Sequence, residues 1–303
     1  MRTLAEIEAY IKSEFNDTST GTQTQIRRLI NAGIRAIKAY TAWPFDEKRG
    51  TDTTVASTSS YNLPKDFHQL RTLKITSGGI DYYPDFIPSR DHWDRITGGM
   101  NSTSESDIPE YFTIYQGKFY IWPVPSSAGN TITYDYYQLD KDYEDAEYTD
   151  QSTGTISIAN GSNEVTGIGT TFLATDVGRY IRLNGYWYKI STFTSTTRID
   201  LERNYEGTSI SGGTYLLGTV TNFSAQYPEV NMVLVDYVLQ YLWRRREDVS
   251  ATGGKASHFK NTYKEGLKEL RKRLKNLNDK PQVHYPRERT VFNPNLDPTN
   301  LTT

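Results

Sequence analysis

The sequence predicts an α+β protein: a helical bundle formed by both termini, with an inserted β-hairpin region and a small all-β module, a barrel or a sandwich. Apolar residues recur at helical spacing near both ends of the chain, whereas strand and turn patterns fill the stretch between them. Amphipathic helices must bury their apolar stripes, and their nearest partners are one another. The expected parts are N-terminal helices over 1–50, a β-rich insertion over 51–150, a small β module over 151–220, C-terminal helices over 221–280 and an extended arm over 281–303.

Two runs of apolar residues predict the N-terminal helices. They are Leu4, Ile7, Ile11 and Phe15, followed by Ile26, Leu29, Ile30, Ile34 and Ile37. Asn16 and Asp17 supply the turn between the helices, and Thr22 or Thr24 can cap the second one. Pro44 stops a helix, so we expect the chain to leave the helices there.

Two further runs predict the C-terminal helices. They are Val230, Val233, Leu234, Tyr237, Val238, Tyr241 and Leu242, and then Phe259, Tyr263, Leu267, Leu270, Leu274 and Leu277. Pro228 is placed for a first helical turn, and Gly253-Gly254 separates the two helices. We expect Ile34 and Leu234 to be buried in one core, with the β module standing apart on its two connections.

Between the helices, turn dipeptides separate short strand-like runs. Gln116-Gly117 lies between Tyr111–Tyr115 and Lys118–Trp122, which predicts a hairpin. Farther along, Asn160-Gly161 and Asn184-Gly185 are strong turn signals among short strands, and they predict the small module.

Composition excludes several classes of protein. The chain has 303 residues and a net charge of -2, so the whole molecule is not an electrostatic nucleic-acid binder. It has no cysteine, which excludes a disulfide scaffold, a thiol nucleophile and a cysteine zinc site. The N-terminus carries Glu6 and Glu8 and lacks an apolar h-region, so we expect no signal peptide. The best apolar run contains Asp236 and Gln240, so we expect no membrane span.

No motif predicts a catalytic, cofactor or metal site, and we expect no enzyme. His68, His92, His258 and His284 show no metal-ligand spacing. The acidic run Asp140, Asp142, Glu144, Asp145, Glu147 and Asp150 begins like a calcium loop, but Asp145 stands at the sixth position, where glycine is needed. A solvated linker is the main interpretation of this run, and a weak divalent-ion site is the other.

Basic residues are concentrated after residue 243. Among them, Arg271, Lys272 and Arg273 are consecutive. One interpretation is the solvated polar face of an amphipathic helix. The other is an electrostatic contact with an acidic protein surface or with DNA phosphates. Both stay open at this point.

The arm over 281–303 contains four prolines and no helical periodicity. Its apolar residues are widely spaced, as are anchors that let an extended segment add to a partner's groove: Val283, Tyr285, Val291, Phe292 and Leu296. We expect Tyr285, Val291, Phe292 and Leu296 to contact a partner. The alternative is a disordered end without a role.

Several segments together resemble the head-to-tail adaptor (connector) proteins of tailed bacteriophages. They are Trp43-Pro44-Phe45, Tyr61-Asn62-Leu63-Pro64-Lys65-Asp66-Phe67, Ile121-Trp122-Pro123-Val124-Pro125, the helices after Pro228, and Gly169-Thr170-Thr171-Phe172 with Asp176-Val177-Gly178-Arg179-Tyr180. The resemblance implies a structural virion protein that forms a ring, usually a dodecamer, below the portal and extends the DNA channel towards the tail. It also implies assembly in the host cytoplasm, a C-terminal segment on the portal or a neighbouring subunit, and downstream tail or nozzle proteins as partners.

Two other functions have weaker support in the sequence. A carbohydrate-binding or adhesin-type tail module would explain Tyr186, Trp187 and Tyr188, but it leaves the long terminal helices unexplained. A tail-associated glycosidase needs two convergent carboxylates, and no pattern in the sequence indicates such a pair.

Overall fold

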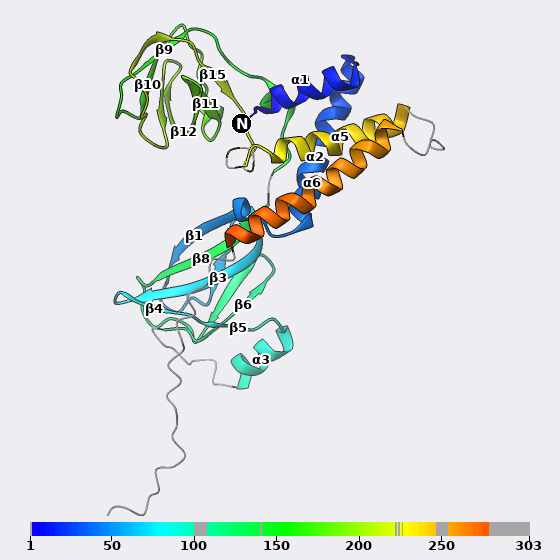
Figure 1. The fold of residues 1–303 in the computed structure, drawn as a ribbon. Helices are drawn as coiled ribbons and strands as arrows, with labels where there is room; N and C mark the ends of the chain where they lie inside the picture. The colour runs from blue at the N-terminus through cyan, green and yellow to red at the C-terminus, as the bar shows by residue number, and fades with distance from the viewer. Residues whose placement is uncertain are drawn as a thin grey trace, which may run out of the picture.

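The structure is a computed structural model that describes residues 2–99, 108–139, 141–221, 223, 225, 227–246 and 254–278. The helices in this part of the chain are α1 (Leu4–Phe15), α2 (Thr20–Tyr40), α3 (Arg90–Gly99), α5 (Val230–Arg246) and α6 (Lys255–Asn278). Three short 3₁₀ turns accompany them: η1 (Pro44–Asp46), η2 (Asp145–Tyr148) and η3 (Ala174–Asp176). In Figure 1, α1, α2, α5 and α6 lie between two separate groups of strands, whereas α3 lies beside the lower group.

The strands form three sheets. Sheet A has the order β1 (Glu47–Thr53), β8 (Thr131–Gln138), β3 (Phe67–Ser77), β4 (Ile80–Tyr82). Sheet B has the order β2 (Ser60–Asn62), β7 (Lys118–Trp122), β6 (Tyr111–Tyr115), β5 (Asp85–Phe86). Sheet C has the order β14 (Ile210–Gly213), β9 (Thr155–Ile158), β10 (Glu164–Ile168), β13 (Arg198–Leu201), β12 (Tyr186–Ser195), β11 (Tyr180–Leu183), β15 (Leu216–Gly218).

Sheets A and B bury a common hydrophobic cluster. It draws Ile75 and Ile132 from sheet A and Phe119 and Ile121 from sheet B, all of them fully buried. The predicted hairpin is confirmed, because β6 pairs with β7 around Gln116-Gly117. Both turn residues have positive φ, 48° and 72°, the left-handed conformation that a two-residue hairpin turn requires.

Sheet C curls around a second cluster (Figure 1), which includes Phe172, Ile181 and Leu217, all with no exposed surface. The chain enters and leaves this unit at one place, because Gln151, just before the unit, forms an antiparallel bridge with Leu217 of its last strand, β15. The unit also contacts the first helix: the Leu4 N–H donates to the Thr219 carbonyl at 2.9 Å. It therefore has a third contact besides its two chain connections.

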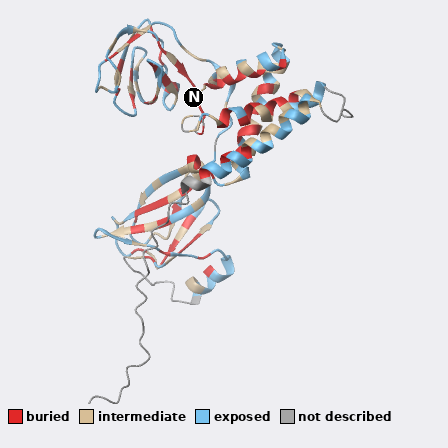
Figure 2. Cartoon of the chain, viewed as in Figure 1, coloured by how far each residue is buried: buried red, intermediate tan, exposed pale blue. Residues whose placement is uncertain are grey.

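The helices α1, α2, α5 and α6 contribute to a third cluster, in which Ile34 and Leu234 are both buried as expected. The buried residues follow the stripes read from the sequence (Figure 2). Ser19 caps α2, accepting the Thr22 N–H at 3.3 Å, so the predicted caps, Thr22 and Thr24, are wrong.

The predicted fold class is wrong. We expected an α+β protein based on a helical bundle formed by both termini, but the described chain is mostly β, with fifteen strands in three sheets and five helices mixed among them. The terminal helices form no self-contained bundle, because Trp43, Phe45, Tyr148 and Phe223 from intervening segments complete their cluster. Helical periodicity is a strong signal and short strands give a weak one. The prediction therefore gave the helices too large a part in the fold class.

One further difference concerns helix α3, and one further prediction has no counterpart among the described residues. Helix α3 was read as strand and turn, yet it forms and buries Trp93 against Ile87 and Trp122. The predicted arm over 281–303, with Tyr285, Val291, Phe292 and Leu296, lies outside the described residues.

Candidate protein-binding surfaces

A row of lysines runs along α6. Lys260, Lys264, Lys268 and Lys272 recur every fourth residue, and all four are exposed. A helix rises 1.5 Å per residue, so the row is about 18 Å long. None of the four forms an ion pair with another described residue. Like charges four residues apart oppose helix formation by about 0.2–0.5 kcal/mol per pair, so the row suits solvent or an acidic partner.

The predicted contact residues lie at the end of this row. Arg271, Lys272 and Arg273 are all exposed, but they differ in their surroundings. The Arg271 guanidinium lies 5.9 Å from the centre of the Tyr40 ring, and Arg273 pairs with Glu229 at 3.2 Å. Arg273 is therefore engaged within the chain, whereas Lys272 belongs to the free lysine row.

Tyrosine rings gather where α5 and α6 pack together. The ring of Tyr237 lies 5.0 Å from that of Tyr241 and 5.2 Å from that of Tyr263. Burial, with a contribution from neighbouring tyrosines, raises the pKa of Tyr237 and of Tyr263 to about 12. Tyr40 and Tyr241 each remain 39% exposed. Half-exposed tyrosines are typical of protein interfaces.

Residues 141–150, which we call the acidic linker, lie along α2. The Asn31 side chain donates to the Tyr143 carbonyl at 3.0 Å and accepts the Tyr143 N–H at 3.1 Å. Arg27 pairs with Asp145 at 3.0 Å, and Arg35 pairs with Asp142. The linker is thus fixed to the helix, while the side chains of Asp142 and Asp145 stay 64% and 83% exposed, as expected of a solvated linker.

The carboxylates of the acidic linker point to separate partners. Lys141 pairs with Glu147 at 2.9 Å, and Thr3 donates to Asp150 at 2.8 Å. Asp140 lies outside the described residues. No group of three or more possible metal ligands occurs among the residues that the structure describes, and His68, His92 and His258 lie on different elements.

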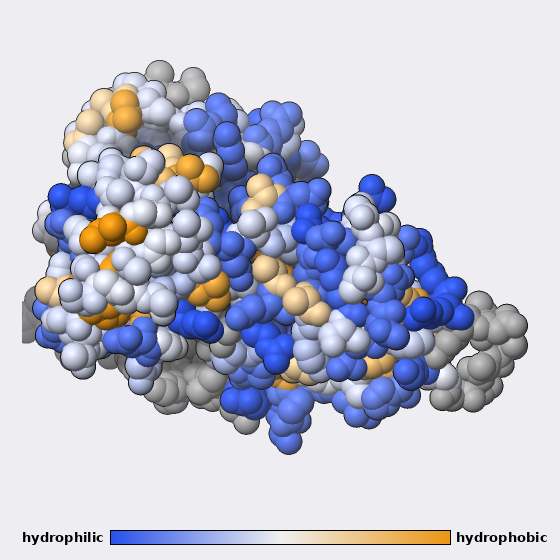
Figure 3. Space-filling view, turned by 90° about the horizontal axis from the view of Figure 1, so that it is seen from above, coloured by the Kyte–Doolittle hydropathy of each residue, from blue (hydrophilic) through white to orange (hydrophobic). Residues whose placement is uncertain are grey.

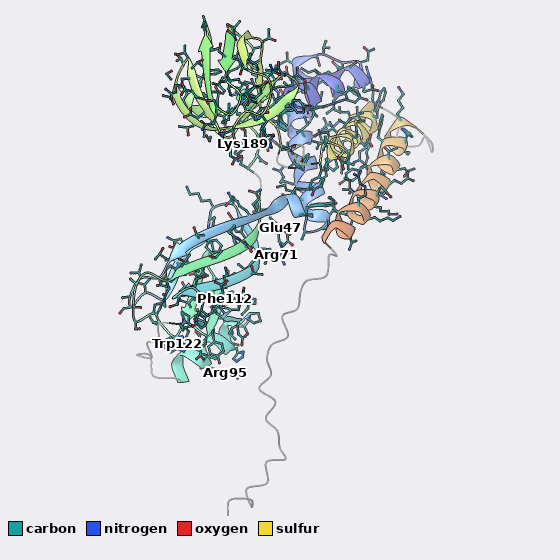
Figure 4. The ribbon with its side chains drawn as sticks, turned by 60° about the vertical axis from the view of Figure 1, so that its left-hand side comes forward. Glu47, Arg71, Arg95, Phe112, Trp122 and Lys189 are labelled. Atoms are coloured by element: carbon teal, nitrogen blue, oxygen red, sulfur yellow. The ribbon has the colours of Figure 1, made fainter. Side chains whose placement is uncertain are left out.

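A cavity of about 470 Å³ lies beside the linker, between α2 and the ends of β3 and β8. Its lining includes Arg35, Ala39, Trp43, Leu139 and Asp142. No sequence pattern indicates this cavity, because its walls come from four segments that only the fold brings together. Figure 4 shows the nearby end of sheet A, where Glu47 and Arg71 form an ion pair.

A buried ion pair lines the same cavity. Lys38 Nζ lies 2.5 Å from Asp46 Oδ1, and the side chains are 9% and 6% exposed. The pair joins α2 to η1, where the chain leaves the helices for sheet A. Removing one member would leave a buried charge without its partner, which typically costs about 3–5 kcal/mol.

The aromatic triplet considered for carbohydrate binding does not form one platform. Tyr186 is 70% exposed, but Tyr188 is 5% exposed and packs against Tyr205 in the core of sheet C. Figure 3 shows scattered hydrophobic residues on the face of the sheet C unit seen from above, and a largely hydrophilic surface over the helices. Exposed apolar residues of that unit include Ile168 and Leu173.

Comparison with known proteins supports the resemblance read from the sequence. The family model described as SU10 adaptor protein matches residues 2–159, just over half of the chain. No curated protein sequence matches the chain. No helix of the described residues is both long and apolar enough to cross a membrane.

Proposed function

The chain belongs to the SU10 adaptor protein family, and we propose that it is a structural virion protein that forms a ring below the portal of a tailed bacteriophage. In this role the ring, a dodecamer in our proposal, extends the DNA channel from the head to the tail. DNA passes through it without its sequence being read, and downstream tail or nozzle proteins bind the far side. We also propose that the protein assembles in the host cytoplasm and becomes part of the head–tail interface.

The family match carries this proposal, because it covers the N-terminal helices and sheets A and B. The exposed surfaces of α5 and α6 also support a protein-binding role. Half-exposed tyrosines are enriched at protein interfaces, and the exposed lysine row suits an acidic partner surface. The family is structural rather than enzymatic, and we propose no reaction.

Two partner contacts belong to the proposal. We propose that the C-terminal arm, through Tyr285, Val291, Phe292 and Leu296, contacts the portal or a neighbouring subunit. We propose also that the basic end of α6, at Arg271, Lys272 and Arg273, faces an acidic protein surface. Exposure of all three basic residues supports the second contact.

Electron microscopy of the purified protein mixed with its portal protein tests the function. We expect a closed ring of adaptor copies on one face of the portal, coaxial with its channel. A protein that stays monomeric and leaves the portal undecorated at micromolar concentration would refute the proposal. Binding to a glycan array by such a monomer would support the tail-module alternative instead.

A further inference from the structure

We propose that the lysine row of α6 binds the acidic linker of a neighbouring copy of this chain. The inference rests on the proposed ring and names the contact that would close it. A contact between two different surfaces of identical subunits is heterologous, and repeated around an axis it generates a ring. Such a contact requires two complementary surfaces that face different directions on one subunit.

The two surfaces lie on opposite sides of the helices. The linker packs on α1 and α2, through η2 and Asn31, whereas α6 packs on α5. Figure 4 shows α5 between α2 and α6. The opposite side of α2 faces α5, because a Cβ placed on Gly33 would lie 2.7 Å from Leu234 and 2.8 Å from Tyr237. One copy can therefore present both surfaces to two different neighbours.

Their charges are complementary. The lysine row carries four positive charges that no described residue neutralises. The linker carries five carboxylates and one lysine, a net charge of -4, and Arg27 and Arg35 of α2 offset two of these negative charges. Its outward carboxylates remain accessible although arginines pair with them: the side chains of Asp142 and Asp145 are 64% and 83% exposed. Glu144 is exposed too. Complementary potentials of this kind fix register and suppress wrong pairings.

Each surface also has an apolar component. Tyr241, 39% exposed, belongs to the tyrosine cluster beside α6. The linker borders the cavity of about 470 Å³, where Leu139 is 48% exposed. Protein interfaces place aromatic anchors in such recesses.

Charge reversal on the full-length protein tests the contact. Lys264→Glu with Lys268→Glu should weaken ring formation at least about tenfold, because like charges would then face each other. Asp142→Lys with Glu144→Lys should weaken it similarly. The chain that carries all four changes should recover rings, because the reversed surfaces are again complementary. Mass photometry at low and high salt measures the assembled fraction.

The matched control is Lys65→Glu with Lys118→Glu, which reverses two exposed lysines beside β2 and β7. It should form rings normally, and circular dichroism should show all variants folded. Normal ring formation by both double variants would overturn the proposed contact. So would a fourfold variant that does not recover ring formation. So would a row reversal that abolishes duplex DNA binding but leaves rings intact. Failure of the unsubstituted protein to form rings with its portal would instead refute the proposed function.

Discussion

Thr3 and Asp150 are joined by a hydrogen bond of 2.8 Å across 147 residues of sequence. The same Thr3 hydroxyl accepts the Glu6 N–H at 3.1 Å, so it caps α1 while it donates to Asp150. One side chain thus connects the start of the first helix to the end of the acidic linker. Next to it, Leu4 bonds the Thr219 carbonyl at the exit of sheet C.

Asp150 should make stability depend on pH in the direction opposite to most carboxylates. Burial raises its pKa above the ordinary 3.8, although the Thr3 hydrogen bond lowers it. The folded protein therefore holds this proton more tightly than the unfolded chain. The stability that this group contributes is complete below pH 3.8 and is lost as the pH rises through the folded pKa.

Asp150→Asn removes the buried charge and keeps an oxygen that can accept from Thr3. We expect the variant to be at least as stable as the unsubstituted protein at neutral pH. The difference should shrink as the pH falls through the folded pKa of Asp150, which burial raises above 3.8. Urea unfolding across this pH range measures it. A variant that is less stable by the same amount at every pH would show that the charge is not costly.

Gly33→Ala should destabilise the packing of α2 on α5. The added Cβ would lie 2.7 Å from Leu234 and 2.8 Å from Tyr237, closer than real contacts allow. We expect a loss of about 1–3 kcal/mol in the free energy of unfolding. Gly21→Ala in the same helix is the control, because its Cβ would meet nothing within 4 Å; it should gain up to about 1 kcal/mol. Equal effects at both positions would contradict the close packing.

Removal of the sheet C unit should leave the helices folded. Gln151 and Leu217 lie opposite each other in an antiparallel bridge, so residues 152–216 can be replaced by an Asn-Gly turn. We propose that residues 151–220 fold independently of the rest. Circular dichroism should retain the helical signal and a cooperative thermal transition. Helices that melt together with this deletion would show that the unit is integral to the remaining fold.

The basic residues near the C-terminal end of α6 should have two different roles, assembly and stability. Arg271→Glu with Lys272→Glu should weaken assembly and make it less dependent on salt, because exposed pairs are screened beyond a Debye length of about 8–10 Å. Arg273→Glu should act mainly on stability, because it places a carboxylate against Glu229. Ring mass and thermal unfolding separate the two effects. Unchanged assembly of the double variant would show that Arg271 and Lys272 belong to a solvated helix face and contact no partner.

Truncation after residue 280 tests the C-terminal arm. About twenty extended residues span roughly 60 Å, enough to reach a neighbouring molecule. We expect the truncated protein to lose affinity for the portal, and Tyr285→Ala with Phe292→Ala to reproduce part of that loss. Surface plasmon resonance with immobilised portal protein measures both. Normal affinity of the truncated protein would leave the arm without this role.

The sequence predicted the local structure where one residue type decides it. Asn184-Gly185 and Gln116-Gly117 form the expected turns, because their positive φ angles favour these residues. The stripe that contains Ile34 identified a buried face correctly. These signals are local, so they can be read without knowledge of the fold.

What the sequence missed depends on contacts between distant segments. Helix α3 is short and has two large apolar residues, Trp93 and Ile96, and Trp93 is buried because the residue after β5, Ile87, and Trp122 of β7 pack against it. The cavity beside Trp43 has walls from separate segments, and the pairing of Arg35 with Asp142 spans 107 residues. Periodicity along one segment carries no information about such partners.

The pairing of β1 with β8 has a mechanical consequence. Glu47 and Tyr137 are register partners, so the chain passes between the helices and sheets A and B on two adjacent strands, β1 and β8. A body held at two neighbouring points can tilt about the line through them far more easily than it can twist or slide. The buried pair of Lys38 and Asp46 braces that line. Sheets A and B are thus attached to the helices along one line, and a force applied to the sheets would act first on the C-terminal end of α2.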